Sequence, residues 1–247
     1  MSDLQARLYR AFDSDPGPIV DFLAWLASTY ELRPPVRILD VGCGPGRLLR
    51  PLAEAGWSVT GFEPNEVFRR AAQQAVQDLG IDVIHSGFND IAAEAAFDMV
   101  VGVNGSFAYL LSSNARQDAL RRCYRALEPG GVLFLDLPNL LRILLEYRGP
   151  GEFDAAMDGY QVHLTRRHEI DFHAAVFTTH EEYVLTRPGE PESTFEAVHA
   201  YSILPYAVLK EALEAAGFAD LRTFTSFEAR TVERIGPGRM MVAARRS

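Results

Sequence analysis

A mostly apolar run that ends in a glycine-rich turn constrains this chain more than any other feature. Residues 36–41 read Val-Arg-Ile-Leu-Asp-Val, which predicts a buried strand of a parallel sheet. The run stops at the segment Gly-Cys-Gly-Pro-Gly, residues 42–46, and leucines at helical spacing follow it. Glycines suit a turn in which the backbone bends sharply and lets a ligand come close. Strand, turn and helix therefore predict the first half of a βαβ unit.

An acidic residue about 20 positions after the turn narrows the ligand. Residues 56–63 predict a second strand, and Glu63 is its last residue. Nucleotide-binding α/β folds place an acid at this point, where its carboxylate can accept hydrogen bonds from both ribose hydroxyls. The two features together indicate a ligand that contains ribose.

Asp40 and three alternating glycines (Gly42, Gly44 and Gly46), followed by Glu63, resemble the motifs of class I S-adenosylmethionine-dependent methyltransferases. A dinucleotide fingerprint has its third glycine one residue later, and here Arg47 occupies that position. The resemblance implies S-adenosylmethionine as cofactor and S-adenosylhomocysteine as product. It also implies that the glycine turn holds the methionine portion and Glu63 the ribose, while Asp40 orders the turn or binds the methionine amine through water.

The adenine end departs from the family pattern. The family usually has an acid directly after the glycine that follows the third strand, but Phe88 follows Gly87 here. Either Asn89 or Asp90 supplies the polar contact, or the backbone does so while Phe88 packs on the adenine ring. The residues that the resemblance assigns to the cofactor are Asp40, Gly42, Cys43, Gly44, Gly46, Glu63, Pro64, Phe88, Asn89, Asn104, Gly105 and Ser106.

The predicted fold class is α/β, with a doubly wound, mostly parallel seven-stranded sheet of the Rossmann-like methyltransferase type and an antiparallel β insert. Residues 1–138 plus 205–247 are expected to form the cofactor-binding domain, with residues 1–33 as a helical lid. Residues 139–204 are expected to form the inserted subdomain, which faces the substrate or a partner subunit. The insert is expected to begin with a helix over 139–148 and to continue with three β segments, at 160–172, 173–185 and 195–204.

The acceptor site is expected between the fourth strand and the insert. The segment from Asn104 to Tyr109 follows the fourth strand and resembles the corresponding motif of small-molecule N-methyltransferases, which places Asn104 and Ser106 near the transferred methyl group. The candidate substrate residues are Tyr109, Arg167, His168 and Tyr201. The catalytic residue is not identified; its candidates are Tyr9, His168 and His199.

No metal site is predicted. His163, His168 and His173 are five residues apart, so successive histidines point to opposite faces of a continuous strand. The chain has two cysteines, Cys43 and Cys123, which form no metal-ligand pattern.

The composition of the chain limits the kinds of binding partner that we expect. The 247 residues carry a net charge of −9, which disfavours a broad phosphate-binding face. No apolar run is long enough to cross a membrane, and the first residues lack the pattern of a secretion signal. We therefore expect a cytoplasmic protein that acts on a small-molecule acceptor, with no nucleic-acid or membrane partner. An exposed edge of the inserted sheet favours a homodimer.

The resulting functional hypothesis is transfer of a methyl group from S-adenosylmethionine to a nitrogen or oxygen of a small molecule by direct in-line displacement. The alternatives are a tRNA or protein methyltransferase, a nicotinamide-dependent oxidoreductase and a binding protein that senses the cofactor. The glycine spacing argues against the oxidoreductase.

Overall fold

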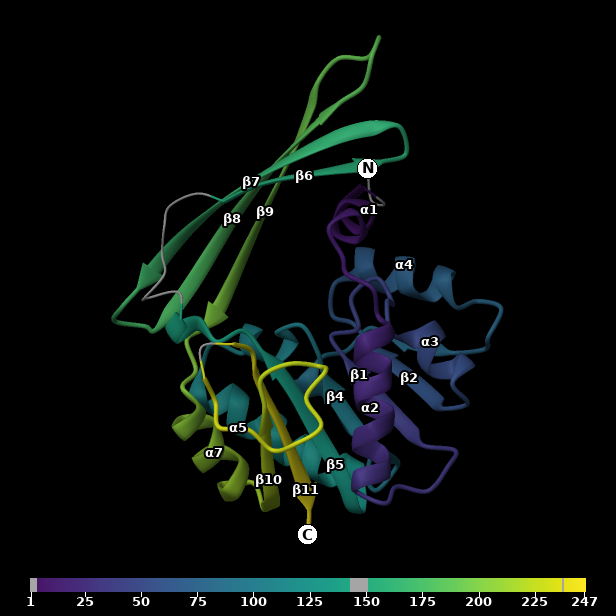
Figure 1. The fold of residues 1–247 in the computed structure, drawn as a ribbon, viewed down its shortest axis with the longest axis vertical. Coiled ribbons are helices and arrows are strands. Elements are labelled where there is room, and N and C mark those ends of the chain that lie inside the picture. The colour runs from purple at the N-terminus through teal and green to yellow at the C-terminus, as the bar shows by residue number, and fades with distance from the viewer. Residues whose placement is uncertain (1–3, 143–150, 237) are drawn as a thin grey trace.

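The computed structural model describes residues 4–142, 151–236 and 238–247. A seven-stranded sheet has the order β10-β11-β5-β4-β1-β2-β3, and a four-stranded antiparallel sheet, β6-β7-β8-β9, lies beyond the carboxyl ends of its parallel strands (Figure 1). The predicted fold class, including the antiparallel insert, is confirmed. The strands of the large sheet are β1 (Arg37–Val41), β2 (Ser58–Phe62), β3 (Asp82–Ile84), β4 (Phe97–Gly102), β5 (Leu127–Leu137), β10 (Phe218–Phe224) and β11 (Met240–Arg246).

The large sheet is parallel except at β11, which pairs antiparallel with both β5 and β10. β1 lies in the interior of this sheet, between β2 and β4. Successive residues of β1 enter different cores, since Ile38 belongs to the cluster on one face and Leu39 to the cluster on the other. This burial on both faces explains why the strand reads as a nearly continuous apolar run.

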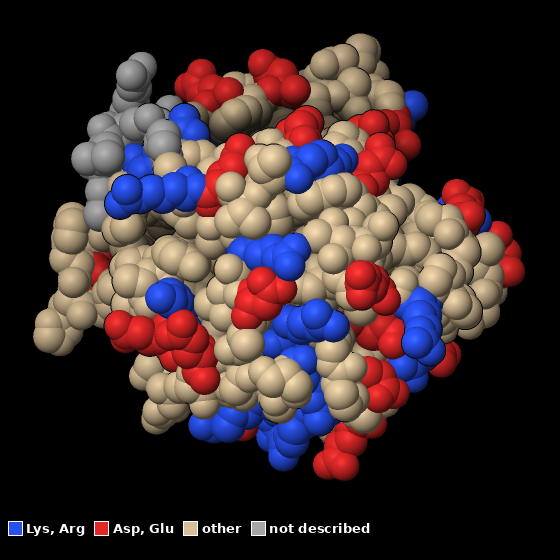
Figure 2. Space-filling view, turned by 60° about the horizontal axis from the view of Figure 1, so that its bottom comes forward, with Lys and Arg blue, Asp and Glu red and all other residues tan. Residues whose placement is uncertain are grey.

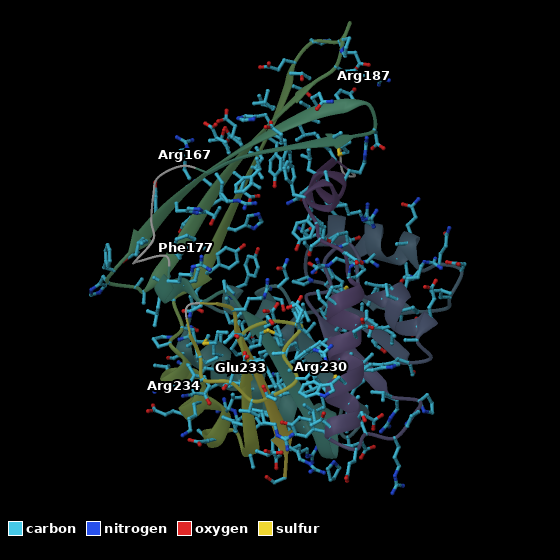
Figure 3. All side chains as sticks on the ribbon, in the orientation of Figure 1. Arg167, Phe177, Arg187, Arg230, Glu233 and Arg234 are labelled. Atoms are coloured by element: carbon cyan, nitrogen blue, oxygen red, sulfur yellow. The ribbon has the colours of Figure 1, made fainter. Side chains whose placement is uncertain are left out.

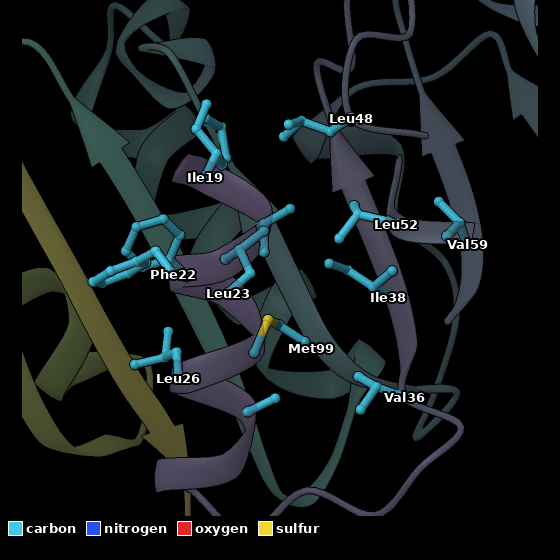
Figure 4. Packing of buried hydrophobic residues seen from close by; sticks show 14 of the residues in the cluster. Ile19, Phe22, Leu23, Leu26, Val36, Ile38, Leu48, Leu52, Val59 and Met99 are labelled. Carbon is cyan, nitrogen blue, oxygen red and sulfur yellow. The ribbon is translucent and has the colours of Figure 1, made fainter. Parts of the chain in front are cut away.

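Helices cover both faces of the large sheet. α2 (Gly17–Thr29), α3 (Leu49–Glu54) and α4 (Glu66–Ala75) contribute to one core. Leu23 of α2 faces β1 and β4 (Figure 4), whereas Phe22 packs on Phe134 of β5 and Phe224 of β10. α5 (Ser113–Ala126) and α7 (Tyr206–Ala215) contribute to the other core. Asn65 caps α4, because its side chain accepts hydrogen bonds from the backbone of Val67 and Phe68.

The small sheet consists of β6 (Gly151–Met157), β7 (Tyr160–Asp171), β8 (Val176–Thr186) and β9 (Ser193–Ser202). The sequence predicted three strands here, and β6 is the strand that it missed. The helix expected over 139–148 falls largely outside the described residues. Helix α4 ends at Ala75, and turns occupy the stretch from there to Gly80.

A short helix, α1 (Leu4–Ala11), lies between the two sheets (Figure 1). Its Leu8 is buried in a cluster with Met157, Val162 and Leu185 of the small sheet. Its neighbours on the other side belong to α4. Among the described residues, no helix has the length and apolar character that a membrane crossing requires.

Candidate active site

A cavity of about 1230 Å³ opens where the carboxyl ends of the parallel strands meet the small sheet. Its floor comes from the ends of β1, β2 and β4, one wall from α1 and the other wall from the inner face of the small sheet. Ligands of open α/β folds bind at this edge of the sheet. The cavity exceeds the range of roughly 300–1,000 Å³ that a single small ligand occupies, so it has room for two ligands side by side.

The glycine turn forms part of the floor. Gly42 has φ +74°, and a Cβ atom there would lie 2.5 Å from the Cβ of Ser106, so only glycine fits between the two loops. Gly44 has φ +57°, but a Cβ atom there would meet nothing within 4 Å. The space in front of Gly44 belongs to the cavity, which leaves its backbone open to a ligand.

Glu63 is buried beside this turn. Its carboxylate accepts hydrogen bonds from the backbone nitrogens of Gly44, at 2.8 Å, and Asn65, at 2.7 Å. Burial raises the pKa of Glu63 above its usual value despite these bonds. Each carboxylate oxygen keeps one further lone pair, and Glu63 lines the cavity, so its carboxylate can accept further hydrogen bonds from a ligand.

Asp40 is a second buried carboxylate at the end of β1. Burial, and then the nearby charge of Glu63, raise the pKa of Asp40 to about 7. A ligand that brings a positive charge to this end of the cavity would offset the cost of two adjacent carboxylates. S-adenosylmethionine carries such charges at its amine and its sulfonium sulfur.

The adenine end has an arrangement that the sequence did not predict. Phe88 packs edge-to-face on Phe107, with ring centroids 5.2 Å apart, and is 5% exposed. Asn89 donates from its side-chain nitrogen to the Ala115 carbonyl of α5, and Asp90 accepts from the backbone of Gly87. All three residues still line the cavity, but these internal contacts engage them, so the adenine partner stays a prediction.

Asp136 of β5 holds the loop that follows β4 in place. The backbone nitrogen of Asn104 donates to the buried carboxylate of Asp136, at 2.8 Å, and Arg239 donates to the same carboxylate. This contact supports Asn104 at φ +57° and aims its side-chain nitrogen at the Tyr9 hydroxyl, 2.9 Å away. Ser106 has a buried hydroxyl without a hydrogen-bond partner among the described residues.

Two residues assigned to the cofactor lie away from the cavity lining. Gly46 and Gly105 do not contribute to it, and the backbone nitrogen of Gly105 donates to the Asp136 carbonyl, at 2.9 Å. The others do line the cavity, and they are Asp40, Gly42, Cys43, Gly44, Glu63, Pro64, Phe88, Asn89, Asn104 and Ser106.

The small sheet brings polar and aromatic side chains to the acceptor side of the cavity. The candidates Tyr109, His168, His199 and Tyr201 line the cavity there, and Tyr9 lines it from α1. Arg167 does not line the cavity, because adjacent residues of a strand point to opposite faces. Arg167 lies on the outer side of the small sheet (Figure 3), and Arg166 faces the cavity in its place.

Glu181 is the residue at the centre of this cluster that sequence reasoning did not identify. Its carboxylate accepts from Tyr183, at 2.6 Å, and from Arg166, at 2.8 Å, and lies 3.6 Å from Nε2 of His199. Burial by itself would raise the pKa of Glu181, but His199, Tyr183 and Arg166 together lower it to about 2. The sequence did contain a sign of this role, because Glu181 is a carboxylate at an inward position of an alternating strand, between Thr179 and Tyr183.

In the described parts of the chain, no group of three or more histidine, cysteine or acidic side chains has an arrangement that would hold a metal ion. The absence of a metal site stays a prediction of the sequence.

The fold and the site define a class of enzyme. Residues 38–131 match the family model described as a methyltransferase domain. The chain is an S-adenosylmethionine-dependent methyltransferase, and S-adenosylhomocysteine is the product that it forms from this cofactor.

Individual relatives agree with this class. The putative methyltransferase YqeM of Bacillus subtilis is 27% identical over 193 residues, which are 77% of this chain and 76% of the relative. Other curated methyltransferases are matched over about half of their length.

Solved structures resemble the whole fold. An S-adenosylmethionine-dependent methyltransferase from Clostridium acetobutylicum has a TM-score of 0.81 at 16% identity, over 98% of this chain and 96% of that one. The sugar N-methyltransferase KedS8 from a Streptoalloteichus species has a TM-score of 0.78 at 24% identity, over 97% and 91% of the two chains.

Proposed function

We propose that this enzyme methylates an amino nitrogen of a small molecule, and that amino sugars are the acceptor class to test first. The observation that carries the proposal is the position of the Tyr109, His199 and Glu181 cluster. It faces the glycine turn and Glu63 across one cavity, whose volume suits a cofactor and a small acceptor together. The sugar N-methyltransferase activity named for KedS8 supports the same choice.

The acceptor side suits a cationic group. Glu181 stays ionised at neutral pH, because the surroundings lower its pKa to about 2. Tyr9, Tyr109, Phe177 and Tyr201 add aromatic rings to the lining, and such rings attract an ammonium group. On the face that Figure 2 shows, basic and acidic side chains are interspersed, which supports a small acceptor over a nucleic acid.

The proposed roles follow the geometry of the cavity. Glu63 accepts from the ribose hydroxyls, the backbone from Gly42 to Gly44 holds the methionine portion, and Asp40 balances its amine. Asn104 and Tyr9 lie between the cofactor end and the acceptor end, where the methyl group would pass. The cofactor supplies an activated methyl group, so alignment of the acceptor nitrogen with it accounts for much of the rate.

Calorimetric titration with S-adenosylhomocysteine tests the cofactor site. We expect Glu63→Gln to weaken binding at least about tenfold, because one charged acceptor of the ribose hydroxyls becomes a neutral amide. The matched control is Glu66→Gln, which changes an exposed carboxylate that forms ion pairs with Arg69 and Arg70 on α4. Equal affinity in wild type and Glu63→Gln would contradict the assigned role of Glu63.

Formation of S-adenosylhomocysteine identifies the acceptor. The panel contains glucosamine, nucleotide-linked amino sugars, glycine, a peptide with a free amino terminus, catechol and transfer RNA. We expect turnover with an amino sugar and none with the matching hydroxy sugar. Turnover restricted to catechol would replace the proposal with O-methylation, and turnover restricted to transfer RNA or the peptide would reject a small-molecule acceptor.

The assembly state belongs to the same proposal. β6 and β9 are the edge strands of the small sheet as far as the structure describes it, so we expect a homodimer. Sedimentation velocity distinguishes a dimer from a monomer.

A further inference from the structure

Four side chains from three elements form a continuous polar cluster on the acceptor side, in which two hydrogen bonds join Tyr109 to its neighbours and an ion-pair contact joins His199 to Glu181. The Tyr109 hydroxyl lies 2.9 Å from Nδ1 of His199 and 3.0 Å from the Tyr201 hydroxyl. On the far side of the imidazole, Nε2 of His199 faces the Glu181 carboxylate at 3.6 Å. Tyr109 lies in the short helix η2 (Ser106–Tyr109), which directly follows the loop of Asn104.

The direction of the contacts among these four side chains follows from the negative charge of Glu181. A carboxylate only accepts hydrogen bonds, so Glu181 favours the tautomer of His199 that carries its proton on Nε2. Nδ1 is then an acceptor, and Tyr109 donates to it. Tyr201 can donate to the Tyr109 oxygen, which leaves that oxygen one lone pair for a ligand.

Solvent exposure decreases from Tyr109 to His199 to Glu181, which is the order that a proton relay from the cavity requires. Tyr109 is 46% exposed and lines the cavity, so a ligand can reach its hydroxyl. The side chain of His199 is 18% exposed and that of Glu181 is 9% exposed. The hydroxyl therefore meets the acceptor, and the imidazole and carboxylate lie behind it.

We propose that Tyr109 and His199 form a proton relay that receives a proton from the acceptor nitrogen, with Glu181 as the positioning residue that sets the tautomer of His199. This inference rests on the proposed function, since it concerns an amine that arrives as an ammonium ion. An amine must lose one proton before its lone pair can attack the methyl group.

The acceptor proton leaves in two linked transfers. The ammonium nitrogen gives a proton to the Tyr109 oxygen, while the Tyr109 proton passes to Nδ1 of His199. The freed lone pair forms the bond to the methyl carbon as the bond from that carbon to sulfur breaks, and the electron pair of that bond stays on sulfur. The products are the N-methylammonium ion, the thioether and an imidazolium, which returns its proton to water.

The surroundings suit a tyrosine that passes a proton and stays neutral. Burial, and then the neighbouring Tyr201, raise the pKa of Tyr109 above its usual value, so its hydroxyl stays protonated and the phenolate does not accumulate. The charge that forms is an imidazolium, and Glu181 faces it. The titratable and charged groups that face this region come from η2, β7, β8 and β9 and from α1, and they are Tyr109, Arg166, His168, Glu181, Tyr183, Tyr201 and Tyr9.

The test compares Tyr109→Phe with Tyr160→Phe. The first variant removes only the relay oxygen, and the second removes the same atom from a tyrosine of the small sheet that bonds Glu190 away from the cavity. With the amine acceptor found in the panel, we expect Tyr109→Phe to lower kcat/KM about a hundredfold at pH 7. We expect that loss to shrink to less than about threefold above the pKa of the amine, where the acceptor arrives neutral. Tyr160→Phe should match wild type throughout.

A loss in Tyr109→Phe that is the same at every pH would assign Tyr109 a structural role and overturn the relay. A pH profile equal to that of Tyr160→Phe would also overturn it. Glu181→Gln gives a second variant, and we expect it to reduce the fraction of neutral His199 that carries its proton on Nε2, since the carboxylate that faces this nitrogen is gone.

A measurement without any acceptor separates this inference from the proposed function. Nitrogen-15 spectra of histidine-labelled protein, loaded with S-adenosylhomocysteine, report which nitrogen of His199 carries the proton. The relay requires the proton on Nε2, and a proton on Nδ1 in neutral His199 would overturn it even if an amine is methylated. If no amine is turned over, the proposed function fails, and with it the relay role, whatever these spectra show.

Discussion

At the scale of single residues, the cofactor end is defined by two carboxylates that the fold buries side by side. Glu63 is satisfied by backbone donors from Gly44 and Asn65, whereas the pKa of Asp40 is raised to about 7 by burial and by Glu63. The fold therefore keeps a carboxylate at Asp40 at a cost in stability. We expect this carboxylate to bind a positively charged ligand, which would offset that cost.

Asp40→Asn tests this cost. The folded pKa of Asp40 lies above its ordinary value of 3.8, so the unfolded chain loses its proton first and the free energy of unfolding falls as the pH rises from about 4 to about 7. We expect the variant to be more stable than wild type at pH 8 by on the order of 2–4 kcal/mol, and by less at pH 5.5. Urea unfolding of ligand-free protein measures both values.

The control for this prediction is Asp82→Asn, which changes an exposed carboxylate on β3. It should show no difference from wild type that depends on pH. A difference between Asp40→Asn and wild type that is the same at pH 5.5 and pH 8 would mean that the amide changes packing and not charge.

Residue identity could be predicted better than residue orientation. Asp40, the glycines and Glu63 followed from spacing, because a strand, a turn and a strand leave few arrangements. The choice between Arg166 and Arg167 depended on which face of β7 meets the cavity, and both faces of that strand carry polar side chains. Glu181 was missed for a related reason, since its partners Arg166, Tyr183 and His199 come together only when three strands pair.

At the scale of elements, α1 is the segment that ties the glycine turn to the small sheet. Arg47, next to the turn, pairs with Asp13 just after α1, and both side chains are largely buried, at 14% and 13% exposed. Arg10 donates to the Pro45 carbonyl within the turn, and Tyr9 contacts Asn104. Arg47, which breaks the dinucleotide fingerprint, thus has a structural role of its own.

Arg47→Gln should loosen this attachment. Burial already raises the pKa of Asp13, and the variant removes the cation that pairs with this carboxylate. We therefore expect the free energy of unfolding to fall by about 1–3 kcal/mol. Limited proteolysis should cut faster between residues 12 and 18, and S-adenosylhomocysteine should bind several times more weakly. Asp13→Asn combined with Arg47→Gln should recover part of both losses.

Arg50→Gln is the matched control, because its ion pair with Asp78 lies on the surface. Proteolysis at 12–18 that is unchanged in Arg47→Gln would show that the packing of Leu8 alone holds α1 in place.

The strand that the sequence failed to predict shows what limits element prediction. β6 reads Gly-Glu-Phe-Asp-Ala-Ala-Met, a short alternation in which only Phe153 and Met157 are large and apolar, so its pairing with β7 decides that it forms a strand. Its turn did carry a signal. Asp158 and Gly159 both have positive φ, at 51° and 83°, as the two central residues of a tight hairpin require.

At the scale of the whole molecule, the two sheets have separate hydrophobic cores. The cores of the large sheet contain α2 to α5 and α7, whereas a third cluster under the small sheet contains Met157, Val162, Leu164, Tyr183 and Leu185 with Leu8 of α1. A four-stranded sheet with one small apolar cluster has few buried contacts of its own, and α1 completes them. We therefore infer that the small sheet can open without unfolding of the large one.

Leu8→Ala tests this division of stability. Leu8 is 1% exposed, and truncation of a buried leucine costs about 2–5 kcal/mol. We expect hydrogen exchange to accelerate in peptides from β6 to β9, while exchange in β1, β4 and β5 stays at its wild-type rate, because the lost contacts belong to the small cluster alone. Leu23→Ala in α2 removes the same atoms from the core of the large sheet and should accelerate exchange in both sheets, since the small sheet cannot stay folded without its support. Equal acceleration in both sheets for Leu8→Ala would show that the molecule unfolds as a single cooperative unit. The acceptor wall would then open no more readily than the cofactor site.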